Sequence, residues 1–220
     1  KTRSHSHLHK RHELSGLTPL QGLAALQVLL LGNTPVTGLS PLQDLTALHT
    51  LDFGNTQVSD LTPLQGLAAL LALGLRNTRV ADLTPLQGLA SLQALHLDNT
   101  QVTDLRPIGG LNALKVLDLR NTPITDLAVL QGLTALQMLA VASTQVTDLR
   151  PIAALPKLGE GQFGGLHFND TPAARASPEL TRLSEIEDDQ QRTRETLAYL
   201  KTLPPWPEPL PWEGTGTGAD

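Results

Sequence analysis

The sequence predicts an α/β repeat protein. We expect a right-handed solenoid with a parallel β-sheet on its concave side, short helical or 3-10 returns on its convex side, and a C-terminal helical cap. A threonine recurs every 22 residues, a leucine pattern precedes each threonine, and both stop after residue 171. A fixed period of this size is typical of solenoids, and parallel crossover connections are right-handed. The periodic threonines are Thr34, Thr56, Thr78, Thr100, Thr122 and Thr144.

Residues 70–91, LLALGLRNTRVADLTPLQGLAS, contain one complete repeat. Leu73 and Leu75 lie two residues apart, so both point to the same face of a short strand. One strand and its return cannot bury these leucines alone, but stacked copies can. We therefore expect Leu73 and Leu95, which is one repeat further on, to be buried against each other.

The second half of the repeat, residues 82–89, reads as a bend and a short helical return. Thr84 is expected to cap the return, Pro85 suits its first turn, and Gly88 can end it. Asp82 is expected to accept hydrogen bonds from backbone N–H groups at the bend.

The motif DLTPLQGL at residues 60–67, with close copies at Asp82, Asp104 and Asp148, resembles the leucine-rich repeat family. It is most similar to the 22-residue class found in bacterial internalins and phosphatase-regulator proteins. The resemblance covers residues 14–171 and implies the leucine-rich repeat fold.

One position departs from the family pattern. The family usually has Asn or Cys where this chain has Thr, and a threonine hydroxyl can do part of the hydrogen bonding of that Asn inside the bend. The asparagines that precede the threonines are expected at the rim or on the concave side. They are Asn33, Asn55, Asn77, Asn99 and Asn121.

We predict four segments. Residues 1–13 are basic and histidine-rich, and are either an eroded first repeat or a terminus outside the solenoid. On a strand, His5, His7 and His9 would share a face and could bind a metal; a solvated terminus is the alternative. The solenoid spans residues 14–171, the helical cap 172–203, and a proline-rich, disordered tail 204–220.

The C-terminal end of the solenoid is irregular. The last repeat begins later than the period requires, which indicates a five-residue insertion near residues 158–162. A helix is expected to start at Ser177–Pro178, with an interruption at residues 187–189. Tryptophans of the tail are expected to pack back on the cap. Residues 197–200, LAYL, faintly resemble the segment that follows the repeats in bacterial Roco GTPases, but this chain has no phosphate-binding GxxxxGK[ST] motif.

Composition narrows the function. The chain has 220 residues, no cysteine and a net charge of −5. Disulfides are therefore absent, and nucleic acid is not the expected partner. No apolar run in the sequence is long enough to predict a membrane span, and no signal peptide is visible. We predict a cytoplasmic protein, with secretion as the alternative, and no cofactor; the oligomeric state is left open.

The concave strands carry the candidate binding site. Side chains in their rows differ from repeat to repeat, and charged residues concentrate in repeats two to five. They could fix the orientation of a protein partner, or they could only neutralise one another. The predicted partner-binding residues are Asp52, Arg76, His96, Asp98, Asp118 and Arg120.

A metal or catalytic site is the third interpretation of this face. His96 between Asp52 and Asp118 could bind a metal or perform acid–base chemistry. Asp52 and His96 lie two strands apart on an open surface, so no metal site and no catalytic residue are predicted.

The predicted function is therefore a non-enzymatic protein–protein interaction module, such as a bacterial scaffold, sensor or regulatory domain. Extended concave surfaces are what solenoids use for binding. The alternatives are a secreted or surface internalin-like adhesin, and a repeat domain that regulates a GTPase or another effector domain of a larger protein.

Overall fold

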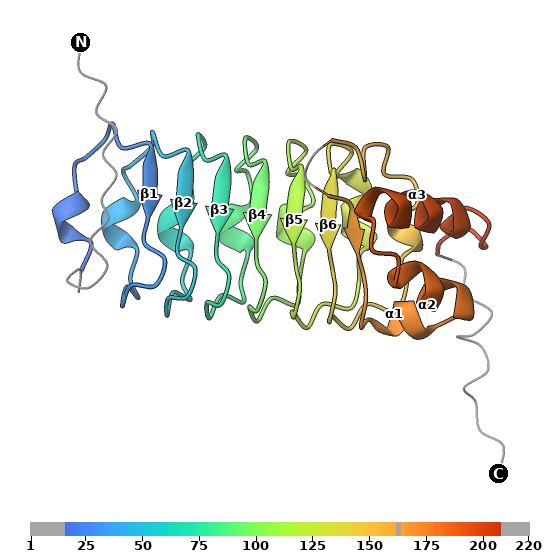
Figure 1. Ribbon diagram of the computed structural model, residues 1–220. Helices are drawn as coiled ribbons and strands as arrows, with labels where there is room; N and C mark the ends of the chain where they lie inside the picture. The colour runs from blue at the N-terminus through green and yellow to red at the C-terminus, as the bar shows by residue number, and fades with distance from the viewer. Residues whose placement is uncertain (1–15, 162–163, 208–220) are drawn as a thin grey trace.

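The computed structural model describes residues 16–161 and 164–207. It is a curved solenoid whose seven short strands form one parallel sheet in chain order (Figure 1). This is the predicted architecture. The strands are β1 (Val28–Leu30), β2 (Thr50–Asp52), β3 (Ala72–Gly74), β4 (Ala94–His96), β5 (Val116–Asp118), β6 (Met138–Ala140) and β7 (Leu166–His167).

The register of the sheet equals the sequence period. Leu73 of β3 pairs with Leu95 of β4, its equivalent in the next repeat, and both are fully buried, as predicted. Leu139 of β6 pairs with Leu166 of β7, a longer step along the chain than between the other strands, which confirms the insertion. The middle residue of every three-residue strand lies in one continuous hydrophobic core.

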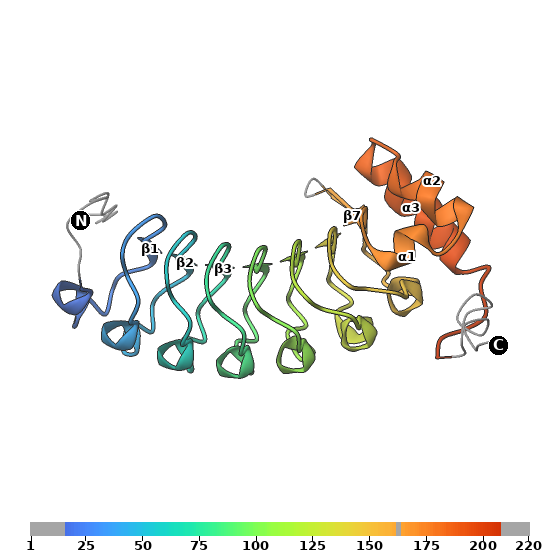
Figure 2. The same cartoon turned by 90° about the horizontal axis from the view of Figure 1, so that it is seen from below.

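The returns are short 3-10 helices on the outer side of the curve, and the sheet lies on the inner side (Figure 2). A three-residue return containing proline is too short for an α-helix, which needs i to i−4 hydrogen bonds. The returns are η1 (Thr18–Leu20), η2 (Ser40–Leu42), η3 (Thr62–Leu64), η4 (Thr84–Leu86), η5 (Arg106–Ile108), η6 (Ala128–Gly132) and η7 (Arg150–Ile152).

The bend before each of the returns η3 to η7 is held by aspartate, not by threonine; before η1 and η2 the equivalent residue is glycine. Asp82 Oδ1 accepts a hydrogen bond from the backbone N–H of Thr84 at 2.8 Å, as expected. The expectation that Thr84 caps the return is wrong: Thr84 is the first residue of η4, and the cap position, Leu83, has no side-chain hydrogen bond. The same Asp-to-backbone bond occurs at Asp60, Asp104, Asp126 and Asp148.

The periodic threonines are buried and bonded within their own repeats. Thr78 Oγ1 donates to the carbonyl oxygen of Leu75 at 2.6 Å, and Thr100 Oγ1 donates to Leu97 at the same distance. These bonds satisfy a backbone acceptor inside the bend, where an unpaired carbonyl would be costly. Threonine thus supplies part of the role that asparagine has in the family pattern.

The preceding asparagines adopt the left-handed conformation, with φ between 53° and 62°. Asparagine tolerates this region better than other non-glycine residues. Asn77 Nδ2 donates to Asn55 Oδ1 of the previous repeat at 2.7 Å, so these two side chains lie together at the surface. This agrees with the predicted rim position.

Three helices follow the last strand: α1 (Pro172–Arg175), α2 (Pro178–Ser184) and α3 (Asp189–Leu200). Ser177 caps α2 through a hydrogen bond from Leu180 N, as expected. The interruption expected near residues 187–189 separates α2 from α3, whose cap is Asp188. The short helix α1 was not predicted; Thr171, the last residue of the threonine series, caps it.

Helix α3 closes the sheet by pairing with the outer edge of β7. Thr193 Oγ1 accepts a hydrogen bond from Leu166 N at 2.8 Å, and Arg192 Nε donates to Leu166 O at 2.7 Å. Gly165 permits this approach, because a Cβ there would lie 2.0 Å from Thr193 Oγ1. These two side chains therefore form hydrogen bonds with the backbone groups that an eighth strand would pair with, so no further strand can add to the sheet at this point.

Some predictions fall outside the described residues, namely those on residues 1–13, Phe163, Trp212 and most of the tail. Trp206 is described and is 38% exposed, and its packing on the cap stays a prediction. The chain entering the tail is held by Arg150, whose Nη1 donates to Pro204 O at 3.0 Å.

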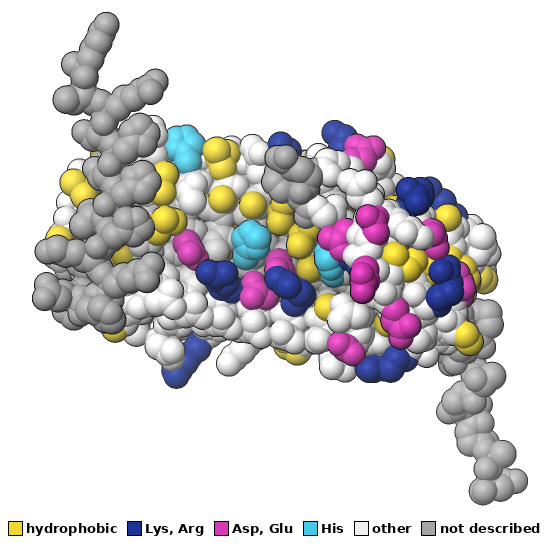
Figure 3. All heavy atoms as spheres, in the orientation of Figure 1, with side chains coloured by type: hydrophobic (Ala, Val, Ile, Leu, Met, Phe, Trp, Pro, Cys, Tyr) yellow, Lys and Arg dark blue, Asp and Glu magenta, His cyan; other side chains and the backbone are white. Residues whose placement is uncertain are grey.

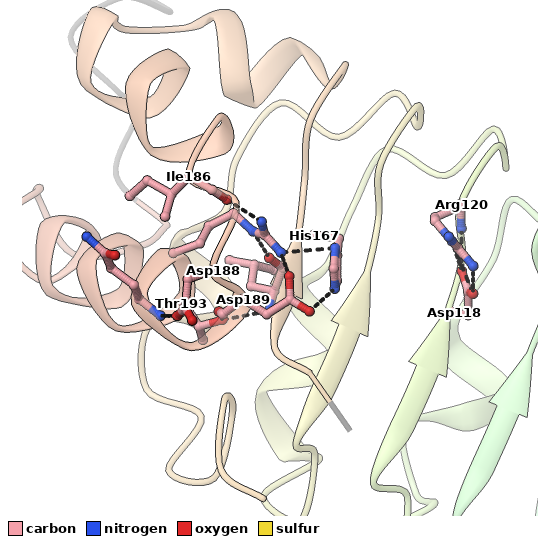
Figure 4. A network of polar contacts seen from close by, with 10 residues as sticks. Asp118, Arg120, His167, Ile186, Asp188, Asp189 and Thr193 are labelled. Carbon is pink, nitrogen blue, oxygen red and sulfur yellow. Dashed lines mark hydrogen bonds and ion pairs between the residues drawn. The ribbon is translucent and has the colours of Figure 1, made fainter. Parts of the chain in front are cut away.

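His167 of β7 lies against α3 in a polar network (Figure 4). Arg192 Nη2 lies 3.0 Å from Nδ1 of His167, and Asp189 Oδ2 lies 3.4 Å from its Nε2. Because arginine only donates, Nδ1 accepts and the ring proton is on Nε2. Burial lowers the pKa of His167, helped by the positive charges of Arg192 and Arg120, while Asp189 and Asp118 oppose the shift.

The first prediction concerns the leucine stack. Leu95→Ala should lower the free energy of unfolding by about 2–5 kcal/mol, because it leaves a cavity in a fully buried site. Leu30→Ala is the matched control: Leu30 is 42% exposed on β1, so its loss should stay within about 0.5 kcal/mol. Urea denaturation measures both, and equal losses would contradict the register.

The second prediction concerns the edge of β7. Thr193→Val keeps the shape of the side chain but leaves the buried N–H of Leu166 unpaired, and should cost about 1–3 kcal/mol. Thr202→Val removes a hydroxyl that donates to Tyr199 O at an exposed site and is the control. If the two variants unfold at the same urea concentration, α3 does not stabilise the edge through this bond.

The third prediction concerns pH. The folded protein holds the pKa of His167 below its ordinary value of 6.5, so the unfolded chain binds more protons as the pH falls through 6.5. Stability should therefore decrease below this pH in the wild type, and less so in His167→Asn. Unfolding curves from neutral to mildly acidic pH test this, and parallel pH profiles would contradict it.

Candidate functional site

The concave face of the sheet carries the predicted site. In each three-residue strand the middle side chain points into the core, so the first and third face the concave side. Figure 3 shows acidic, basic and histidine side chains gathered across the middle of this face. The row of third residues reads Leu30, Asp52, Gly74, His96, Asp118, Ala140 and His167.

The six predicted residues are not equivalent. Asp52, His96 and Asp98 are half-buried, and Arg76 and Arg120 are exposed. Asp118 is only 2% exposed, so it does not contribute a free charge to the surface as the sequence suggested.

Asp118 and Arg120 form a close ion pair within one repeat. Arg120 Nη2 lies 2.6 Å from Asp118 Oδ2, and Arg120 Nε lies 2.9 Å from Oδ1. The hydrogen bonds to Asp118 raise the pKa of Arg120, with a smaller contribution from Asp98. A buried carboxylate needs such a partner, so Arg120 first neutralises Asp118 and has less freedom to meet another molecule.

Asp52 and Arg76 each lie over a glycine of the neighbouring repeat. A Cβ at Gly74 would lie 2.5 Å from Asp52 Oδ1, and one at Gly54 would lie 2.9 Å from Arg76 Cγ. Asp52 Oδ1 also accepts a hydrogen bond from Gly54 N at 2.9 Å. Among the described residues Arg76 makes no ion pair, so its guanidinium is available to a partner.

His96, Asp98 and Asp118 come together at the centre of the face. One potential ligand atom of each lies within 4.8 Å of the other two. The third interpretation, a metal or acid–base site, combined His96 with Asp52 and Asp118, and Asp52 is two strands away, as the register required. The carboxylate that lies beside His96 is instead that of Asp98, two residues further along the chain.

The N-terminal end of the concave face is apolar. Val28 and Leu30 of β1 are 37% and 42% exposed. The sequence prediction includes only charged residues and His96, so it misses this apolar end. The signal that could have found it is the lack of polar residues at the concave positions of the first repeat.

A hollow beside the cap was not predicted. It is open to solvent and is lined by Gly161, Gly164 and the acidic segment 187–190. The sequence indicated only a helix interruption at this acidic segment.

None of the helices formed by residues 16–161 and 164–207 is long and apolar enough to cross a membrane.

Comparison with known proteins agrees with the repeat geometry. A family model described as Leucine Rich repeats (2 copies) matches residues 24–66 and 90–132. A search of curated proteins finds no significant match.

Solved structures give closer parallels. An internalin (inlF) from Listeria monocytogenes is 31% identical, with a TM-score of 0.64 over 73% of this chain and 47% of the other. Internalin C2 of the same organism is 33% identical, with a TM-score of 0.65 over 68% and 64% of the two chains. A leucine-rich repeat protein from Leptospira interrogans, 24% identical with a TM-score of 0.63 over 81% and 47%, shares the fold.

The chain spans 47% and 64% of the lengths of the two internalins. The similarity therefore concerns the repeats and not the whole of those proteins. The 22-residue register, the 3-10 returns and these matches show that this chain is a leucine-rich repeat protein whose repeats are of the internalin-like class.

Proposed function

We propose that the chain is a non-enzymatic protein-interaction module that binds a protein partner on its concave face. The partner contacts the concave patch, defined as Asp52, Arg76, His96, Asp98, Asp118 and Arg120. The observation that carries the proposal is the difference in sequence variation between the convex and the concave surface. The outer returns repeat nearly the same sequence, as at Thr62–Leu64 and Thr84–Leu86, whereas the concave side chains change with every repeat.

Within the patch, Arg76 is the main anchor. It is exposed, lies over Gly54, and has no ion-pair partner among the described residues. A positive charge of this kind recognises a carboxylate of a partner, and an exposed charge acts mainly on association rate and specificity. Arg120 contributes less, because it is held by Asp118.

The apolar end of the face extends the binding surface. Val28 and Leu30 lie on β1, next to Asp52 of β2. An apolar contact beside a charged patch provides both burial and orientation, as in the core and rim of protein interfaces. The partner therefore places an apolar side chain over β1 and an acidic side chain near Arg76.

The similarity to two internalins favours a second version of the same function, a secreted or surface adhesin. The leading version is a cytoplasmic scaffold, sensor or regulatory domain. The two versions share the concave face and differ only in compartment. Fractionation of cells that express the complete gene distinguishes them.

The fourth prediction tests the patch. Arg76→Glu should reduce capture of the partner from an extract of the source cells, because it reverses the charge that meets the partner's carboxylate. Arg79→Glu is the matched control: it makes the same charge change in the same repeat, at an exposed position outside the strand. Quantitative mass spectrometry compares proteins captured by the wild type and by each variant.

The affinity of each captured protein is then measured at low and high salt, with circular dichroism as a folding control. A partner lost by Arg76→Glu but retained by Arg79→Glu supports the concave site. Equal capture by all three proteins would contradict it. Arg120→Glu is a poorer test, because a second carboxylate beside buried Asp118 would destabilise the fold.

A further inference from the structure

The cluster of His96, Asp98 and Asp118 has the composition of a metal site. His96 is the last residue of β4 and pairs in register with Asp118, the last residue of β5. Asp98 lies two residues after His96. Potential ligand atoms of the three side chains lie within 4.8 Å of one another, so small side-chain rotations bring all three to one ion.

Two of the three ligands are available. Among the described residues neither ring nitrogen of His96 makes a hydrogen bond, and Asp98 accepts only one long side-chain bond, from Asn99 Nδ2 at 3.3 Å. The third ligand is held in place: the side chain of Asp118 is 3% exposed and its carboxylate is fixed by Arg120. A ligand that is already ordered loses little conformational freedom when it binds.

We propose that His96, Asp98 and Asp118 bind a divalent transition-metal ion of the Zn²⁺ or Co²⁺ type on the concave face. One imidazole nitrogen and two carboxylate oxygens suit such ions better than Ca²⁺ or Mg²⁺, which prefer all-oxygen sites. Three protein ligands leave at least one coordination position for water. The site does not depend on the protein-binding proposal, because it is tested with the metal alone.

Arg120 competes with the metal for Asp118. Without metal, its guanidinium compensates the buried carboxylate. With metal, the ion takes over this role, and Arg120, whose side chain is 51% exposed, can turn towards solvent. A positive neighbour weakens the affinity for a cation, so removing Arg120 should strengthen metal binding.

The histidines of residues 1–13 are potential metal ligands in their own right and are removed so that they do not obscure the result. The experiment therefore uses the full chain in which His5, His7, His9 and His12 are replaced by Asn. Zn²⁺ is titrated by calorimetry, and Co²⁺ is followed by its visible absorption. We expect one equivalent to bind, with a Co²⁺ spectrum that Zn²⁺ abolishes.

In this background, His96→Ala and Asp98→Asn should each weaken Zn²⁺ binding at least about 10-fold, since even the loss of an outer-shell partner costs that much. Arg120→Gln should bind more tightly and show a larger rise in melting temperature with Zn²⁺. Asp44→Asn changes an exposed carboxylate outside the cluster and should bind as the background does. No binding at millimolar Zn²⁺, or binding that His96→Ala and Asp98→Asn leave unchanged, would overturn the proposal.

Discussion

The constant 22-residue interval between paired positions of β1 to β6 is the constraint on which this structure depends. Because Leu73 pairs with Leu95 at the same point of consecutive repeats, the buried leucines of the strands meet their equivalents, and one core runs through the solenoid. The same register aligns Asp82 with its equivalents at each bend and places the threonines in one buried series. A shift by one residue would turn all of these side chains to the wrong face.

A core built from stacked repeats is exposed at both ends. At the C-terminal end of this sheet, a helix covers the last strand. At β7 the repeat is lengthened by an insertion, and α3 takes the place of a further strand. Arg192 and Thr193 pair with both backbone groups of Leu166, so the edge is satisfied without another repeat. Arg192 also holds His167 and Asp189, which joins the cap to the last position of the concave row.

The sequence was sufficient for what the period determines. Strand positions, register and the buried leucines of the strands follow from local patterns repeated many times, and the start of α2 follows from the local capping signal of Ser177 and Pro178. It was not sufficient for contacts between distant residues that occur once. The pairing of Arg192 with Leu166, far from it along the chain, follows no period, and nothing in the sequence distinguishes Arg192 from the other arginines of that segment.

The candidate site was predicted only in part. The register predicted which residues share a row on the concave face, but it did not predict how deeply each side chain is buried. Asp52 and Asp118 occupy the same place in their repeats, yet Asp118 is buried under Arg120, whereas Asp52 lies over Gly74. The difference is the residue two positions later, Arg120 in one repeat and Gly54 in the other, and its effect appears only when side-chain positions are known.

The position of Arg120 links the two proposals for the concave face. While Arg120 is paired with Asp118, the pair adds no net charge to the patch. An ion bound by His96, Asp98 and Asp118 would add two positive charges and leave Arg120 free to face a partner beside Arg76. A metal that favours an acidic partner must in turn be bound more tightly when that partner is present, because the coupling free energy between two sites is reciprocal. The six patch residues carry a formal charge of −1 when His96 is neutral, so a bound divalent ion would change the charge of the patch from negative to positive.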